Sequence, residues 1–157
     1  MLIQDETPPP RTPIFTQGFP LIVLILTLAI TGVSLIQFNA SPQFEDWIMR
    51  AGAIITGPEF EGLERPYGPL TPLVGHTLLH VNLFHLVMNM TAMLSFGPII
   101  ALGLGKGGRS AGLFLLFFAI CAVGGALAEI AWASAQGANQ IAIGASSALS
   151  GFLPAVG

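Results

Sequence analysis

The sequence predicts an all-α polytopic membrane protein. Of its 157 residues, 53% are hydrophobic and only 8% are charged, whereas a soluble globular domain carries about 25% charged residues. The hydrophobic residues come in long blocks and not in helical stripes or alternating strands, which is the pattern that lipid requires. One integral membrane domain, residues 19–157, is therefore the simplest interpretation.

Four apolar blocks predict the transmembrane segments. The first block has no charged residue, and at 1.5 Å per residue its length matches a hydrocarbon core of roughly 30 Å. The blocks lie at residues 19–38, 78–102, 111–133 and 141–157. The last is still apolar where the chain stops, so we expect it to be an incomplete helix. Residues 39–77 form a long loop in which Trp47 could anchor a short amphipathic helix at the membrane interface.

The charged residues predict orientation and limit the possible partners. Residues 1–18 are polar and proline-rich and are expected to form a disordered cytoplasmic tail. Three basic residues fall on the predicted side of this tail and two on the other, which favours a cytoplasmic N-terminus in the cell (inner) membrane. The two sets are Arg11, Lys106 and Arg109 against Arg50 and Arg65. The net charge of −3 and the absence of a basic run leave the lipid bilayer, and not nucleic acid, as the expected partner.

Four polar residues in the second block or just before it carry the strongest chemical signal. They are His76, His80, His85 and Asn89. Polar groups at this depth are expensive and usually face a protein interior or a wet cavity. A continuous helix would place His85 and Asn89 on one face and His76 and His80 on another. Such groups could donate hydrogen bonds to an oxyanion, although interhelical hydrogen bonding is the alternative.

A serine-containing stretch of small residues, AIGASSALSG at 142–151, begins the last block. Small neighbours let a serine hydroxyl, a substrate backbone and amide donors approach closely, as a serine nucleophile requires. Helix packing needs small residues too, so the stretch alone does not decide between the two roles.

Together the two motifs resemble the rhomboid intramembrane protease family. The family pattern H-x3-H-x4-H-x3-N is complete in the four polar residues, and Gly144-Ala145-Ser146-Ser147 is similar to the family's G-x-S-G. Phe96-Gly97-Pro98 and the order of the elements extend the resemblance over roughly residues 68–157. The implied fold is a rhomboid-like helix bundle, truncated to about four of six transmembrane helices.

The resemblance also implies a chemistry and a role for each residue. Ser146 would be the nucleophile that cleaves transmembrane-protein substrates through an acyl-enzyme, without a cofactor or metal. His85, Asn89 and the amide of Ser146 would stabilise the oxyanion. The supporting residues would be His80, His76 and Gly144. Single-pass transmembrane proteins would be the substrates.

Two departures from the family pattern affect these expectations. Ser147 stands where the family has glycine. The family's general base is a histidine on the sixth helix, and none of the three histidines here holds that place, so we expect this chain to be a fragment that is inactive alone. Ser150 also precedes a glycine, but it lacks the glycine two residues earlier, so Ser146 is preferred.

Two other functions remain open from the sequence. A non-catalytic rhomboid-like protein could bind client helices through the same surface. Alternatively, His76, His80 and His85 could hold a metal ion or haem, although no carboxylate or cysteine ligand accompanies them.

Overall fold

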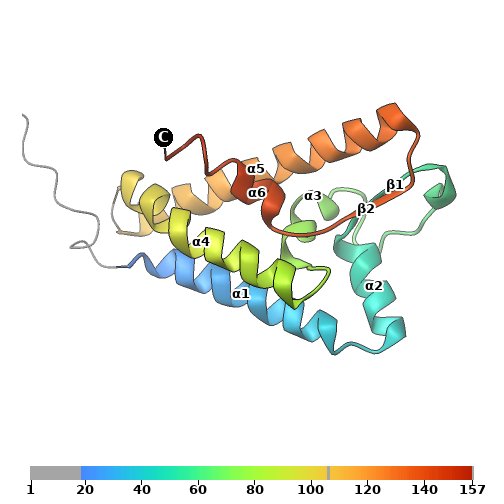
Figure 1. Ribbon diagram of the computed structural model, residues 1–157, viewed down its shortest axis with the longest axis horizontal. Helices are drawn as coiled ribbons and strands as arrows, with labels where there is room; N and C mark the ends of the chain where they lie inside the picture. Colours follow the sequence, from blue (N-terminus) through green and yellow to red (C-terminus); the bar gives the residue numbers. More distant parts are fainter. Residues whose placement is uncertain (1–18, 106, 157) are drawn as a thin grey trace, which may run out of the picture.

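A computed structural model describes residues 19–105 and 107–156, so the predicted N-terminal tail lies outside the described residues. In chain order the elements are α1 Leu21–Phe38, α2 Pro42–Gly52, β1 Ile54–Thr56, η2 Pro58–Phe60, α3 Pro72–Gly75, η3 His76–Leu78, α4 Leu83–Gly103, α5 Gly107–Gln136, β2 Gln140–Ala142 and α6 Ser146–Ser150 (Figure 1). Helices dominate, as expected.

Three helices of the described residues, α1, α4 and α5, are long and apolar enough to cross a membrane. They run along the length of the molecule, with the start of α1 and the α4–α5 turn at one end and α2 at the other (Figure 1). The prediction of an all-α polytopic membrane protein is thereby confirmed. Helix α5 has 30 residues, about 45 Å at 1.5 Å per residue, and so exceeds both its predicted extent and a bilayer core of roughly 30 Å.

Helix α1 buries one stripe against α4. The buried residues follow each other at intervals of three or four positions, which places them on one helical face. They are Val23, Thr27, Ile30, Ser34 and Gln37. Near the start of α1 the two helices approach closely, because a Cβ added at Gly97 would lie 2.9 Å from Val23 Cγ1. The last two residues of the stripe are polar and contact the segment before α4.

The second transmembrane helix begins at Leu83 and not near residue 78, as the sequence predicts. Asn82 has extended backbone angles, and its side chain accepts a hydrogen bond from His85 N at 2.9 Å. An asparagine in this position caps a helix and satisfies a backbone N–H that has no partner within the helix. His76 and His80 therefore precede α4, and the expectation that they share one face of this helix is wrong.

Of the predicted last span, residues 141–157, the structure describes residues 141–156, and within these the helical part is the five-residue helix α6. Residues of β2 are extended because they pair antiparallel with β1, with Ile55 opposite Ile141. Gly144 follows with φ of +126°, a conformation that glycine adopts readily and that ends the strand. This two-stranded sheet is not predicted from the sequence, and it joins the long loop to the segment that precedes the serine motif.

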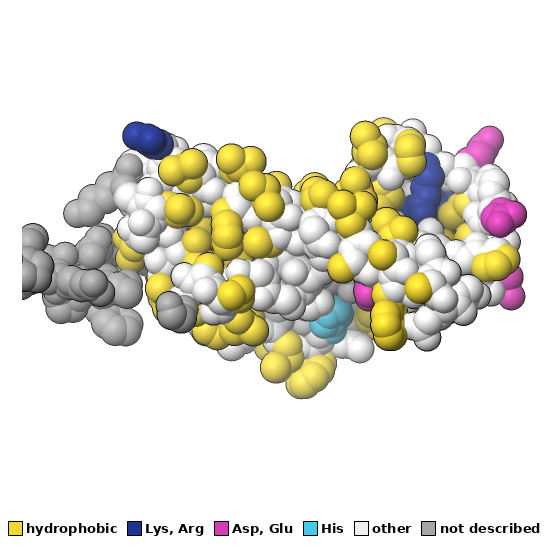
Figure 2. Space-filling view, turned by 90° about the horizontal axis from the view of Figure 1, so that it is seen from above, with side chains coloured by type: hydrophobic (Ala, Val, Ile, Leu, Met, Phe, Trp, Pro, Cys, Tyr) yellow, Lys and Arg dark blue, Asp and Glu magenta, His cyan; other side chains and the backbone are white. Residues whose placement is uncertain are grey.

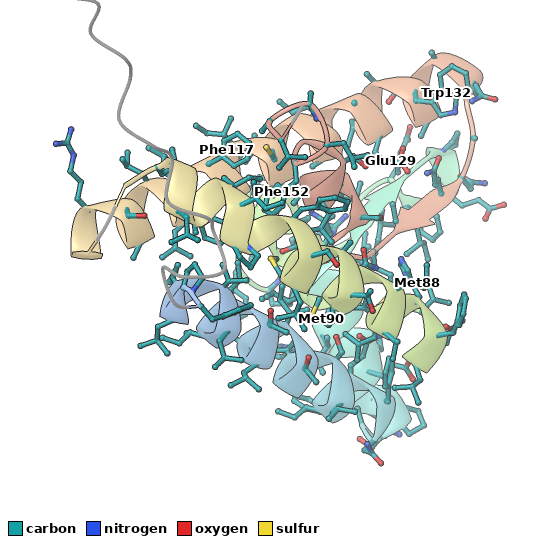
Figure 3. All side chains as sticks on the ribbon, turned by 60° about the vertical axis from the view of Figure 1, so that its left-hand side comes forward. Met88, Met90, Phe117, Glu129, Trp132 and Phe152 are labelled. Atoms are coloured by element: carbon teal, nitrogen blue, oxygen red, sulfur yellow. The ribbon has the colours of Figure 1, made fainter. Side chains whose placement is uncertain are left out.

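The C-terminal segment is held by aromatic packing against α5. Phe152 is fully buried, and its ring centroid lies 5.8 Å from that of Phe114 and 5.7 Å from that of Phe117. Figure 3 shows Phe117 and Phe152 next to each other between α5 and the segment after α6. Within a membrane such packing is favoured by van der Waals contact and not by removal from water, and it holds the segment after α6 on α5.

The polar end of the molecule is built by α2 and the long loop. Acidic side chains gather there in the space-filling view, while hydrophobic side chains cover much of the remaining surface (Figure 2). The Arg65 guanidinium donates to the backbone carbonyls of Arg50, Ala53 and Ile55 at 2.7–3.2 Å. These bonds hold the loop compact beside β1.

Candidate active site

The serine loop lies directly against the ring of His85. A Cβ added at Gly144 would lie 2.5 Å from His85 Cε1 and 2.9 Å from its Nε2, well inside ordinary van der Waals separation. Glycine is therefore required here for two reasons, its positive φ and the imidazole above it. Two residues later, Ser146 begins α6 and is exposed. The structure thus places the His85 ring against Gly144, two residues before the predicted nucleophile.

His85 and Asn89 lie one turn apart in the first part of α4. Asn89 is buried, with 5% of its surface exposed, and its Nδ2 donates to the His85 carbonyl at 3.0 Å. An amide nitrogen carries two hydrogens, so one remains for another acceptor. His85 is half-buried. The spacing of four residues thus lies within a single helix, as the sequence predicts.

His80 is held by the end of α1. Its Nδ1 lies 2.9 Å from Ser34 Oγ, while the Gln37 amide bonds both the N–H and the carbonyl of His80 at 3.0 Å. Burial and the neighbouring His85 ring, whose centroid is 5.1 Å away, lower the pKa of His80 to about 4. His80 is therefore neutral at neutral pH and supports the loop before α4.

His76 contacts the serine motif through Ser147. Its Nδ1 donates to the Pro72 carbonyl at 2.8 Å, because a carbonyl can only accept. The neutral Nε2 then accepts from the Ser147 hydroxyl at 2.6 Å. The His76 carbonyl also accepts the N–H of Gly144 at 2.8 Å. Within the serine motif of the described residues, the hydroxyl that pairs with a histidine is thus that of Ser147 and not that of Ser146.

Three residues that contact the histidines are not predicted from the sequence. Ser34 and Gln37 bind His80, and Ser147 binds His76. The first two carry a signal in the sequence, because polar residues three positions apart inside an apolar span face the same neighbour. Ser147 carries no comparable signal, since its partner lies 71 residues away.

The structure does not assemble a metal site from the three histidines. Both ring nitrogens of His76 are engaged, and His80 directs Nδ1 to Ser34. Over residues 19–105 and 107–156 no group of three or more His, Cys, Asp or Glu side chains has the arrangement to hold an ion. The geometry thus gives the metal or haem hypothesis no support.

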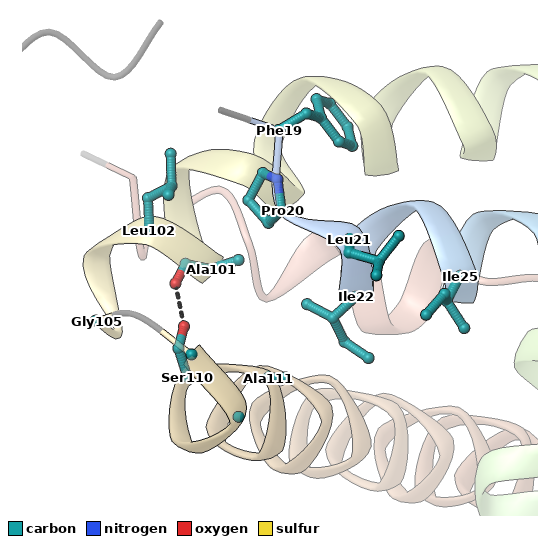
Figure 4. A pocket seen from close by; sticks show the side chains of 12 residues that line it. Phe19, Pro20, Leu21, Ile22, Ile25, Ala101, Leu102, Gly105, Ser110 and Ala111 are labelled. Carbon is teal, nitrogen blue, oxygen red and sulfur yellow. Dashed lines mark hydrogen bonds between the residues drawn. The ribbon is translucent and has the colours of Figure 1, made fainter. Parts of the chain in front are cut away.

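A cavity of about 510 Å³ lies at the opposite end of the bundle, between the start of α1 and the α4–α5 turn (Figure 4). Its lining is mostly apolar and contains no histidine. Beside it, Ser110 Oγ donates to the Ala101 carbonyl at 2.6 Å and joins the two helices. The cavity is separate from the serine and histidine cluster.

Comparisons with known proteins agree with the resemblance in the motifs. The family model of the rhomboid domain matches residues 67–156, which include all four polar residues of the histidine motif and the serine loop. Comparisons with curated proteins and with solved structures gave no match. The matched segment is more than half of the 157 residues, and the chain therefore belongs to the rhomboid family.

Proposed function

We propose that this chain forms the nucleophile and oxyanion side of an intramembrane serine endopeptidase. Family membership supports the reaction class. The single observation that carries the proposal is the contact between the loop of Ser146 and the ring of His85, made possible by Gly144. Ser146 is exposed at the start of α6, where a substrate backbone can reach its hydroxyl.

In the proposed reaction, Ser146 Oγ attacks the carbonyl carbon of a peptide bond and loses its proton to a base. The tetrahedral oxyanion receives hydrogen bonds from the Ser146 N–H, His85 and the free hydrogen of Asn89 Nδ2. Collapse breaks the C–N bond, the amine leaves with the proton, and water then hydrolyses the acyl-enzyme. Preorganised donors matter here because bulk water does not stabilise charge inside a bilayer.

In the proposal, none of the three histidines of this chain serves as the general base. His76 is occupied by Ser147 and Pro72, His80 is bonded to Ser34, and His85 serves as an oxyanion donor in the proposal. The substrates would be single-pass transmembrane proteins, and no cofactor is needed. Arg109 lies at the end of α5 that the proposal places on the cytoplasmic side of the cell (inner) membrane, with the N-terminus.

The test is cleavage of a model transmembrane substrate by the complete gene product in proteoliposomes. Ser146→Ala should abolish cleavage. Ser150→Ala should retain it, because the Ser150 hydroxyl is exposed and donates to the Ser146 carbonyl of its own helix at 2.8 Å. Asn89→Ala should lower turnover by on the order of 10- to 1000-fold as an oxyanion donor is lost. Cleavage by Ser146→Ala at the parent rate would end the proposal.

A second candidate function is a non-catalytic protein that binds client helices. The observation that favours it is the pairing of a histidine with Ser147 and not with Ser146. A fluorophosphonate probe separates the two functions. An adduct on Ser146 excludes a silent site, whereas binding of helices without any adduct supports the second function.

A further inference from the structure

We propose that His76 and Ser147 form a clamp that positions the nucleophile loop, which makes Ser147 a positioning residue of the site. The inference rests on the proposed function of Ser146. It assigns a role to the hydroxyl that stands where the family has glycine.

The clamp holds the loop on both sides of Ser146. Before it, the Gly144 N–H donates to the His76 carbonyl at 2.8 Å. After it, the Ser147 hydroxyl donates to His76 Nε2 at 2.6 Å. Backbone and ring of a single residue thus bind the positions two before and one after the nucleophile. Between these two bonds the Ser146 backbone has little freedom to move relative to His85.

The His76 side of the clamp is rigid. The residue is 2% exposed, and its Nδ1–H donates to the Pro72 carbonyl at 2.8 Å. This bond fixes both the ring plane and the tautomer, leaving Nε2 as an acceptor. Burial lowers the pKa of His76, so the ring keeps a free lone pair for Ser147 at neutral pH.

The Ser147 side is fixed by close packing on α5. A Cβ added at Gly125 would lie 2.6 Å from Ser147 Cβ and 3.2 Å from Ser147 Cα. The glycine lets α5 approach the first turn of α6 at a distance that any side chain would prevent. Ser147 therefore lies between α5 and His76, and its hydroxyl is directed to the His76 ring.

A glycine at position 147 would permit the same backbone approach but could not donate to His76. The buried Nε2 would then lose its partner, and an unmade buried hydrogen bond destabilises the arrangement that needs it. Displacements of about 1 Å at a catalytic group can lower a rate by on the order of 100-fold. The hydroxyl thus acts on Ser146 through loop position and makes no contact with the reacting atoms.

The test compares Ser147→Ala and Ser147→Gly with the parent in the complete gene product. For the transmembrane substrate, kcat should fall roughly 10-fold or more while KM changes by less than about 2-fold. Amide hydrogen exchange at residues 144–147 should become faster, and the unfolding temperature should fall, because the buried His76 Nε2 loses its partner. Ser95→Ala is the matched control, because this exposed hydroxyl bonds the Thr91 carbonyl of its own helix. This substitution should leave kcat, KM, hydrogen exchange and the unfolding temperature unchanged.

Several results would overturn the clamp. A lower unfolding temperature with unchanged kcat per folded molecule would make Ser147 merely structural. Fluorophosphonate labelling that survives Ser146→Ala but disappears in Ser147→Ala would make Ser147 the nucleophile itself. If the parent neither cleaves nor labels, the proposed function fails separately. Hydrogen exchange then decides the clamp, which is supported by faster exchange in Ser147→Ala and refuted by unchanged exchange.

Discussion

Gly124 and Gly125 are neighbours in α5, and we expect their alanine variants to behave differently. A Cβ at Gly125 would lie 2.6 Å from Ser147 Cβ, whereas a Cβ at Gly124 would have nothing within 4 Å. Ordinary carbon contacts lie near 3.5–4.0 Å. Gly125→Ala must therefore push α5 and α6 apart by about 1 Å, while Gly124→Ala requires no adjustment.

The expected difference in unfolding free energy follows from a comparison of the two variants. Both replace a mid-helix glycine by alanine, which favours the helix by about 1 kcal/mol, so this gain cancels in the comparison. The remaining difference is the overpacking cost, about 1–3 kcal/mol. Gly125→Ala should accordingly have a free energy of unfolding lower than that of Gly124→Ala by this amount. It should also cleave more slowly, because Ser147 moves away from His76.

The free energy of unfolding of both variants can be measured by denaturant titration in detergent micelles, with the fluorescence of Trp47 and Trp132 as the signal. Cleavage of a transmembrane substrate is measured on the same preparations. A difference in unfolding free energy below about 0.5 kcal/mol, or equal cleavage by the two variants, would refute the close approach of α5 and α6.

Three further predictions test other parts of the site. Gln37→Leu leaves the buried N–H and carbonyl of His80 without partners and should lower the free energy of unfolding by about 2–4 kcal/mol. Asn39→Ala removes an exposed amide and should change the free energy of unfolding by less than about 0.5 kcal/mol in the same titration. Equal effects of the two substitutions would contradict the contact between Gln37 and His80. Gly144→Ala should abolish cleavage, because its Cβ would overlap the His85 ring and its φ is +126°, and full activity would show that the loop does not need this contact. The pKa of His80 is lower in the folded state than the ordinary value of 6.5, so the folded state binds a proton on His80 less readily than the unfolded state does. The free energy of unfolding should therefore fall as pH decreases from about 6.5 to 4. His80→Gln should flatten this pH dependence, and an unchanged slope would assign the dependence to other groups.

The apolar blocks predict the membrane helices because their signal is local. A long run of apolar residues without charges favours lipid over water, whatever the sequence of the rest of the chain. The pair His85 and Asn89 is predictable for the same reason, since a spacing of four residues stays within one helix. Gly125 contacts α6 and the adjacent Gly124 does not, a difference that only the structure reveals.

The remainder depends on contacts between distant segments. Helix α4 begins at Leu83 because Asn82 caps it, and the hydrophobicity of the sequence does not reveal where such a cap starts the helix. Strands β1 and β2 have three residues each, too short for an alternating pattern, and they exist only because they pair across the chain. The bond between Ser147 and His76 likewise depends on how α6 packs on α5.

The measurement that tests the central claim most directly is mass-spectrometric mapping of the fluorophosphonate adduct on the complete gene product. We expect an adduct on Ser146 that disappears in Ser146→Ala and persists in Ser150→Ala. An adduct on Ser147, or none on either serine in preparations that cleave substrate, would contradict the assignment of Ser146 as the nucleophile.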